Sequence, residues 1–139
     1  MHYFVFPEID TTLYQASGSS NAGLDEILEV RKTMSNSGGN INVSRILIKF
    51  DISEISSSIV NGTISTDAKY YLNMYDAGSE ELSTSQSLWA YPVSQSWVEG
   101  QGTFSDNPKT TEGASWNFRD GLTQKTYWLS GSEAAASSS

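Results

Sequence analysis

The side chains most able to do chemistry surround one polar stretch, "SWVEGQGTFSDNPKTTEGASWNFRDG", which runs from residue 96 to residue 121. Indole rings can stack on the flat faces of sugars, and carboxylate and amide groups can bond hydroxyl groups. Alternatively, Trp97 and Trp116 pack on a sheet and pin the loop between them, because a buried indole contributes a few kcal/mol. We favour this clamp, with the outer face of the loop meeting a partner. The candidate ligand or clamp residues are Trp97, Glu99, Trp116, Asn117 and Asp120.

Catalysis is not predicted. The only histidine is His2, beside the first residue, and no G-x-S-x-G motif exists, so a Ser-His-Asp arrangement has no support. Glycoside hydrolysis needs only a carboxylate pair, and Glu99, Asp106, Glu112 and Asp120 lie near tryptophans. However, acidic residues in Gly/Ser-rich loops commonly cap turns. We therefore predict a non-enzymatic protein without catalytic residues.

Metal and cofactor sites have little support. The chain has no cysteine, which excludes both disulfides and thiolate metal sites, and mildly favours assembly inside a cell. The acidic loops could offer oxygen ligands to calcium, but the D-x-[DN]-x-[DN]-G pattern is missing. A structural calcium stays open, its ligands are unknown, and no other cofactor is predicted.

The overall charge excludes several partners. Sixteen acidic and eight basic residues give a net charge of −8, and no basic patch is visible, so neither nucleic acid nor an anionic membrane is an expected partner. The apolar run in "MHYFVFPEID" is too short for a signal peptide or a membrane span.

Composition and patterning predict an all-β chain. Charged residues make up only 17%, and Ser, Thr, Asn and Gly are abundant. Residues 44–53 alternate with period two, which predicts a strand with Ile46, Ile48 and Phe50 facing the core. Further strands are expected over 24–32, 68–78 and 86–97, and one helical turn capped by Ser53 over 53–58. About six strands indicate an antiparallel β-sandwich of jelly-roll type.

One domain, 1–128, and a polar low-complexity tail, 129–139, are therefore expected. The order of motifs in this domain resembles the DNRLRE-type domain, related to carbohydrate-binding-module-like jelly rolls. The resemblance covers about residues 10–128. It is carried by Arg45, Leu47, Phe50 and Asp51, by Leu72 and Tyr75, by Trp97, Glu99 and Gly100, and by Gly113, Trp116 and Asn117.

Versions of this domain rich in Asn, Ser and Thr are similar to virion structural proteins of tailed bacteriophages. The resemblance implies a decoration protein of a head, neck or fibre, assembled in the host cytoplasm, with other virion proteins and copies of itself as partners. The alternative is a carbohydrate-binding module that attaches a particle or a parent protein to glycan. The family continues with further strands where this sequence ends, so an incomplete C-terminal end is also expected.

Overall fold

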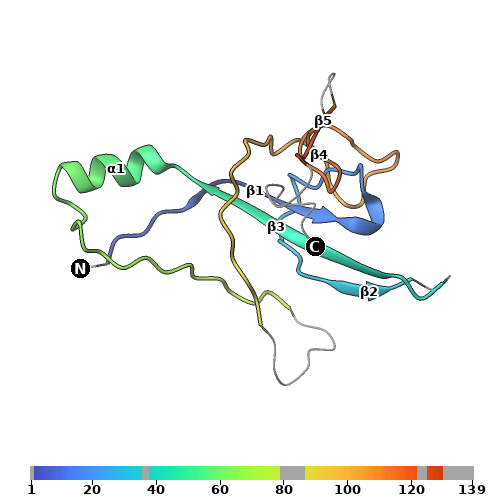
Figure 1. Cartoon of the computed structure of the whole chain (residues 1–139), viewed down its shortest axis with the longest axis horizontal. Helices are drawn as coiled ribbons and strands as arrows, with labels where there is room; N and C mark the ends of the chain where they lie inside the picture. Colours follow the sequence, from blue (N-terminus) through green and yellow to red (C-terminus); the bar gives the residue numbers. More distant parts are fainter. Residues whose placement is uncertain (1, 36–37, 79–86, 122–124, 130–139) are drawn as a thin grey trace. The chain divides into compact units, whose positions relative to one another are not determined.

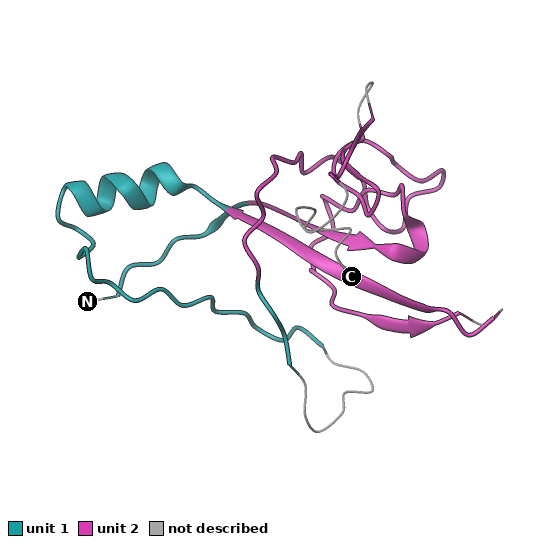
Figure 2. Ribbon diagram, viewed as in Figure 1, with its two compact units in different colours: residues 1–8, 50–90 teal, residues 9–49, 91–139 magenta. Residues whose placement is uncertain are grey.

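The computed structural model describes residues 2–35, 38–78, 87–121 and 125–129. These residues form two compact units, shown in different colours in Figure 2. Unit 1 comprises Met1–Glu8 and Phe50–Ala90, and unit 2 comprises Ile9–Lys49 and Tyr91–Ser139. The prediction of a single domain over 1–128 stays a prediction.

Antiparallel strands dominate the architecture (Figure 1). One sheet has the order β1-β3-β2, and β4 and β5 form a second, two-stranded sheet. Strand β2 pairs antiparallel with β3, so that Thr33 lies opposite Asn42. The elements are β1 (Pro7–Tyr14), a 3-10 turn η1 (Gln15–Ser17), β2 (Lys32–Met34), β3 (Ile41–Phe50), α1 (Ile52–Val60), β4 (Phe118–Asp120) and β5 (Thr126–Tyr127).

The core of unit 2 joins the three-stranded sheet to the C-terminal part of the chain. Leu13 of β1 and Leu47 of β3 pack in one buried cluster with Ala114 and Trp128. The indole nitrogen of Trp128 donates a hydrogen bond to the Ser115 carbonyl at 2.8 Å, which satisfies the one polar group of this buried ring.

The strand predicted over 44–53 is confirmed as β3, but its core face is not the one expected. Leu47 is only 6% exposed, whereas Ile46, Ile48 and Phe50 are half-buried. Both faces of this strand carry large apolar side chains, so period-two alternation separates them without showing which meets the second layer.

The helical turn expected over 53–58 is longer and begins earlier than predicted. Helix α1 covers Ile52–Val60, and its cap is Asp51, whose carboxylate accepts a hydrogen bond from the Ser53 amide. Asp and Ser are comparable caps, and Asp51 stands one position before the helix, where the cap must lie. Within unit 1, the Tyr3 hydroxyl donates to Glu54 at 3.0 Å and accepts from the buried Ser58 hydroxyl at 3.3 Å.

Three other predicted strands are absent from the described residues. Residues 24–31 are irregular and β2 begins only at Lys32, while 68–78 and the described part of 86–97 form no strand. Alternating side chains favour an extended backbone, but a strand also needs a partner to accept its hydrogen bonds. The large apolar residues exposed in these segments include Leu24, Ile27, Val30, Tyr70, Tyr71, Leu72, Met74, Tyr75, Leu88, Trp89 and Tyr91.

The prediction of an all-β fold is confirmed: the structure is mostly β, with antiparallel sheets and one short helix, as a β-sandwich requires. The jelly-roll winding and the incomplete C-terminal end stay predictions. The predicted tail over 129–139 lies, apart from Leu129, outside the described residues.

Candidate functional site

A buried asparagine organises the loops of unit 2. Asn21 is fully buried, and its amide nitrogen donates to the Glu99 carbonyl at 2.6 Å and to the Ala114 carbonyl at 2.8 Å. Its amide oxygen accepts from the amides of Gly23 at 3.1 Å and Gly102 at 2.8 Å. These four bonds use the whole hydrogen-bonding capacity of the side chain, so one residue joins three loop segments. We call Asn21 and these four partners the Asn21 hub.

Two glycines allow the loops to approach the hub. Gly100 and Gly113 have φ of 85° and 95°, a left-handed backbone that favours glycine. A Cβ atom at Gly113 would clash with the Cα of Gly100 and would lie 2.7 Å from the Asn21 amide nitrogen. These glycines belong to the motifs W-x-E-G and G-x-x-W-N. Their lack of a side chain lets the backbones of the two motifs approach each other closely.

The loop between Trp97 and Trp116 is also tied down by the segment that follows Asn21. The backbone amide of Asn21 donates to the Thr110 carbonyl at 2.8 Å, and the backbone amide of Leu24 donates to the Gly102 carbonyl at 2.9 Å. The Asp25 carboxylate accepts from the Phe104 amide, at 3.0 and 3.2 Å to its two oxygens. Main-chain bonds therefore hold the loop along its length.

The two tryptophans at the ends of that loop lie against the core. Trp97 and Trp116 are half-buried and pack against the cluster of Leu13, Leu47, Ala114 and Trp128. Arg45 lies over the Trp116 ring, with its guanidinium carbon 4.8 Å from the ring centroid, and burial lowers the pKa of Arg45. This packing supports the clamp proposal for both rings.

The other candidate residues have separate roles. Glu99 is half-buried, and its carboxylate accepts a hydrogen bond from the Asp10 amide of β1 at 3.1 Å. Asn117 is exposed, its amide donates to the Gly18 carbonyl at 2.9 Å, and its side chain lies against Gly18. Asp120 is half-buried in β4. The Glu99 carbonyl therefore belongs to the Asn21 hub, and the Glu99 carboxylate bonds the backbone of β1.

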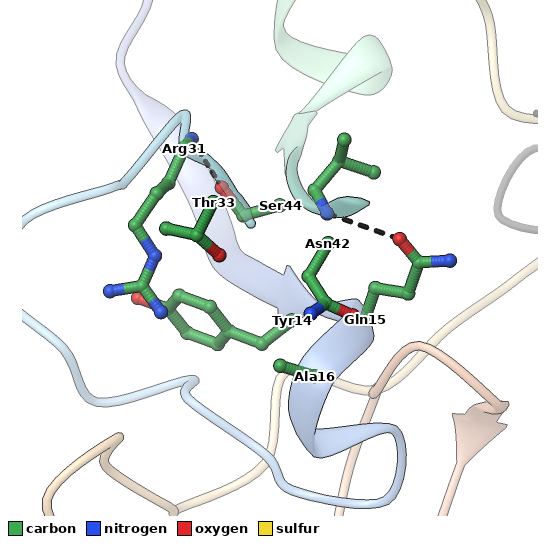
Figure 3. Close-up of a pocket in the computed structure, with 8 residues that line it drawn as sticks. Tyr14, Gln15, Ala16, Arg31, Thr33, Asn42 and Ser44 are labelled. Atoms are coloured by element: carbon green, nitrogen blue, oxygen red, sulfur yellow. Dashed lines mark hydrogen bonds between the residues drawn. The ribbon is translucent and has the colours of Figure 1, made fainter. Parts of the chain in front are cut away.

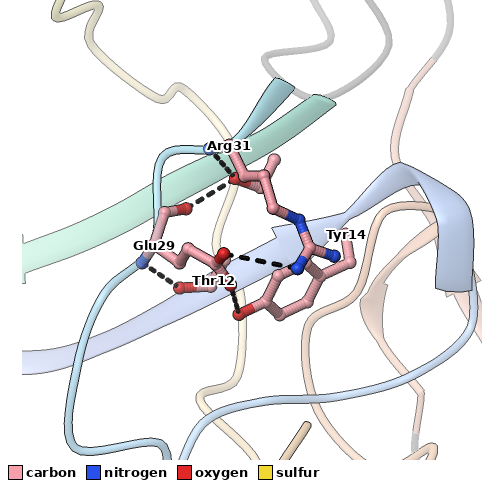
Figure 4. Close-up of polar contacts among 5 residues, drawn as sticks. Thr12, Tyr14, Glu29 and Arg31 are labelled. Carbon is pink, nitrogen blue, oxygen red and sulfur yellow. Dashed lines mark hydrogen bonds and ion pairs between the residues drawn. The ribbon is translucent and has the colours of Figure 1, made fainter. Parts of the chain in front are cut away.

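A second polar cluster lies beside β2, and the sequence analysis did not identify it (Figure 4). Glu29 is its centre, because one carboxylate oxygen accepts from the Tyr14 hydroxyl at 2.9 Å and the other pairs with Arg31 at 3.4 Å. The Glu29 amide donates to the Thr12 hydroxyl at 3.1 Å, and its carbonyl accepts from the Ser44 hydroxyl at 2.6 Å. Side chains of β1 and β3 thus fix the chain that leads into β2.

The Arg31 guanidinium is held over two aromatic rings. Its central carbon lies 5.5 Å from the ring centroids of both Tyr14 and Phe104, which contact each other at 4.5 Å. The Arg31 amide donates to the Ser44 hydroxyl at 2.6 Å. A guanidinium supported in this way keeps its outer edge in a fixed direction.

Burial raises the pKa of Tyr14, and the hydrogen bond and charge of Glu29 raise it further. The Tyr14 hydroxyl therefore stays protonated at neutral pH and acts as the donor to Glu29. Its role in the cluster is to orient the carboxylate.

A small pocket opens beside this cluster (Figure 3). Its volume is only about 10 Å³, enough for one water molecule or one hydroxyl group. Its wall includes Tyr14, Gln15, Arg31, Thr33 and Asn42. Thr33 and Asn42 are cross-strand partners, so their side chains are neighbours on one face of the β2–β3 pair. The region has the polar side chains of a surface binding site and no cavity for a whole sugar ring.

No signal in the sequence points to this second cluster. Residues 24–32 read as an ambiguous apolar segment, and its acidic and basic side chains carry no motif. Asn21 had only a local signal, since Asn-x-Gly favours a turn in which the Asn side chain bonds the backbone two residues on.

Neither a cluster of metal ligands nor a membrane-spanning helix is present in the part of the chain that the structure describes. No group of three or more His, Cys, Asp or Glu side chains there is placed to hold a metal ion. Nor does any helix in the described residues have the length and apolar character needed to cross a bilayer.

Comparison with known proteins gave one result. The model of carbohydrate-binding module family 96 matches residues 2–128. Neither the curated proteins nor the solved structures gave a match. The match includes the motifs around Gly100 and Gly113 and the cluster around Glu29.

Proposed function

We propose that this protein, which belongs to carbohydrate-binding module family 96, binds glycan without catalysing a reaction on it. The observation that carries the proposal is the family match, which extends over residues 2–128 and so includes nearly the whole chain. It favours the alternative of the sequence analysis over its main prediction.

The arrangement of unit 2 supports this function. Glycans present many hydroxyl groups, each of which can both donate and accept a hydrogen bond. The β2–β3 face offers a guanidinium, a hydroxyl and an amide at the surface, in Arg31, Thr33 and Asn42. The chain therefore has polar side chains at this surface that can bond the hydroxyl groups of a glycan.

The finer predictions concern the particle on which such a module would act. A place on a bacteriophage virion, partners among other virion proteins and self-association rest on the sequence resemblance alone. Mass spectrometry of purified particles and light scattering of the purified chain test these predictions. A glycan-binding module can serve a virion by attaching it to a surface, so the two functions are compatible.

Binding to a broad glycan array, followed by affinity electrophoresis through gels that contain the glycans selected, tests the proposed function. We expect retention of the folded chain in some gels and none in gels without glycan. The heat-unfolded chain serves as the control for nonspecific retention. Absence of binding to every glycan at millimolar concentration contradicts the proposal.

A further inference from the structure

We propose that Asn61 is a site of spontaneous covalent modification, at which the Gly62 backbone nitrogen attacks the Asn61 side chain and converts its amide to a carboxylate. This inference goes beyond the proposed function and does not rest on it. The site lies in unit 1, in the turn that follows α1. It consists of Asn61, Gly62 and Thr63, all of them exposed, and we call it the Asn61 turn.

The reaction needs only water. The Gly62 nitrogen forms a bond to the side-chain carbonyl carbon Cγ of Asn61, and the bond from Cγ to Nδ2 breaks. The side-chain nitrogen leaves as ammonia, with a proton that balances the one lost by Gly62. Water then opens the cyclic imide. Breaking its bond from nitrogen to Cγ gives an aspartate side chain, whereas breaking the main-chain bond gives isoaspartate, in which the backbone runs through Cγ.

Gly62 leaves the attacking nitrogen accessible. Asn61-Gly62 is the one Asn-Gly pair in the sequence, and glycine hinders its own backbone nitrogen least because it has no Cβ. Gly62 has φ of 79°, and a Cβ added to it would meet nothing within 4 Å. The turn is therefore open around the bond that forms.

Thr63 activates the carbon that is attacked. The Oδ1 atom of Asn61 accepts hydrogen bonds from the Thr63 amide at 3.0 Å and from the Thr63 hydroxyl at 2.6 Å. Negative charge develops on this oxygen as the nitrogen attacks, and two donors that already point at it stabilise that charge. Both contacts join residues only two positions apart, so they do not depend on the rest of α1.

One hydrogen bond opposes the reaction. The Gly62 amide donates to the Ile59 carbonyl at 3.1 Å, in the last turn of α1. This bond must open before the nitrogen can reach the Asn61 side chain. Exposed helix ends open at a low cost in free energy, so the bond slows the attack without preventing it.

Two other asparagines show what the combination adds. Asn21 is fully buried, its side-chain amide is bonded to the backbone through both of its polar atoms, and Ala22 follows it. Asn73 is exposed and belongs to unit 1, as Asn61 does, but Met74 follows it, and the Met74 side chain hinders the backbone nitrogen. Asn73 is therefore an internal control for exposure.

The product changes the end of α1. Asn61 is the C-cap, and its backbone amide donates to the Ser57 carbonyl at 2.9 Å. A carboxylate at this position meets the negative end of the helix dipole. Isoaspartate also lengthens the backbone between α1 and the buried Ile64, whose amide donates to the Ser58 carbonyl at 2.9 Å. The modification therefore weakens the attachment of this turn to α1.

The test follows the full chain during incubation at neutral and mildly alkaline pH. Peptide mapping by mass spectrometry locates the exchange of an amide for a carboxyl group, and methylation by protein isoaspartate methyltransferase measures isoaspartate. Thr63→Val removes the hydroxyl donor and keeps the amide donor, whereas Thr63→Ser keeps both. Gly62→Ala adds a Cβ in open space, so only the backbone strain of its positive φ acts on the fold. Circular dichroism verifies that each variant is folded.

We expect Asn61 to be converted first, at a rate that rises with pH because the nitrogen attacks after losing its proton. Thr63→Val should slow the conversion about tenfold, the effect of removing one hydrogen bond to a developing charge. Thr63→Ser should restore the rate. Gly62→Ala should slow the conversion further than Thr63→Val, because its Cβ hinders the nitrogen. Asn73 should stay unconverted over the same time.

Three outcomes overturn the inference. Retention of Asn61 in the folded chain, while a synthetic peptide of residues 57–67 reacts, shows that the turn protects the amide. Conversion of Asn73 as fast as Asn61 shows that exposure alone decides the site. An unchanged rate in Thr63→Val shows that the hydroxyl bonded to Oδ1 does not activate it.

Discussion

Two asparagines of unit 2 have the same side-chain amide but differ in how the protein uses it for hydrogen bonding. Asn21 is fully buried and makes four side-chain hydrogen bonds to backbone groups of three loop segments. Asn42 is half-buried on β3, lines the small pocket, and its side chain makes no hydrogen bond to any described residue. Burial causes this difference. A buried amide needs hydrogen-bond partners from the protein, whereas a partly exposed one can find them in solvent or ligand.

The regions around the two residues differ in the same way. The Asn21 hub is neutral and closed by glycines that let the backbones touch. The cluster around Glu29 and Arg31 is charged, partly exposed, and contacted by aromatic rings and hydroxyl groups. We infer that the hub stabilises the loops, whereas the partly exposed side chains around Glu29 and Arg31 can also reach solvent.

The largest expected effect comes from exchanging each asparagine for alanine. Asn21→Ala removes the partners of two buried amides, one buried carbonyl and one half-buried carbonyl, so we expect a loss of at least about 3 kcal/mol in the free energy of unfolding. Asn42→Ala should change it by less than about 0.5 kcal/mol. Urea denaturation measures both. Equal losses in the two variants would contradict the contrast.

Two glycines with positive φ sharpen the comparison further. Gly113→Ala places a Cβ against Gly100 and Asn21, whereas Gly39→Ala, at φ 69°, meets nothing within 4 Å. Both variants lose about 1 kcal/mol from the left-handed backbone. Gly113→Ala should lose about 1–3 kcal/mol more through overpacking. Thermal unfolding of the pair isolates the packing part, and a difference near zero would show that the loops at the hub can separate.

A smaller effect is expected at Ser44, which connects β3 to the chain at Glu29 and Arg31. Ser44→Ala removes the acceptor of the Arg31 amide and the donor to the Glu29 carbonyl, both at 2.6 Å. We expect a loss of about 1–3 kcal/mol in the free energy of unfolding. Thr33→Val is the control for stability, as its side chain is exposed. A Ser44→Ala variant as stable as the control would show that these two hydrogen bonds do not hold the chain at Glu29 and Arg31.

The smallest effect is a pH dependence within the long loop. Hydrogen bonds, first from the Thr110 hydroxyl and then from the Thr103 amide and hydroxyl, lower the pKa of Asp106. A depressed pKa means that this stabilisation is present above the ordinary Asp pKa of about 3.9 and is lost as pH falls through the lower folded-state value. Asp106→Asn should therefore flatten the acid side of a stability profile between pH 7 and pH 3, measured by thermal unfolding. An unchanged slope in that variant argues against the contribution of Asp106.

Local patterns predicted the elements whose reasons are local. Alternation predicted β3, the serine-rich stretch after it predicted a helical turn within what is α1, and the composition predicted an all-β chain. The alternation of side chains was less informative where a strand needs a neighbouring strand to pair with. Residues 68–78 alternate as clearly as β3 does, yet they form no strand, because alternation cannot supply the neighbouring hydrogen bonds.

The candidate residues show the same limit. Trp97, Glu99 and Trp116 were recognisable as a group from their types and spacing, and the structure places both rings against the core and uses the Glu99 carboxylate for the Asp10 amide. Nothing local to Arg31 shows that its guanidinium lies over Phe104, because that contact joins two distant parts of the chain. Residue type indicated which side chains could bind a ligand or clamp the loop. The tertiary contacts decided which of them lie together.

The sequence by itself determined the β character, the acidic charge and the lack of a histidine-based triad. These depend on backbone preferences and composition, which act over a few residues or over the chain as a whole. Only the tertiary structure decided that Asn21 bonds carbonyls 78 and 93 residues away, and that Arg31, Thr33 and Asn42 line one small pocket. Hydrogen bonds act only within about 3 Å, so their partners are determined once the chain has closed upon itself.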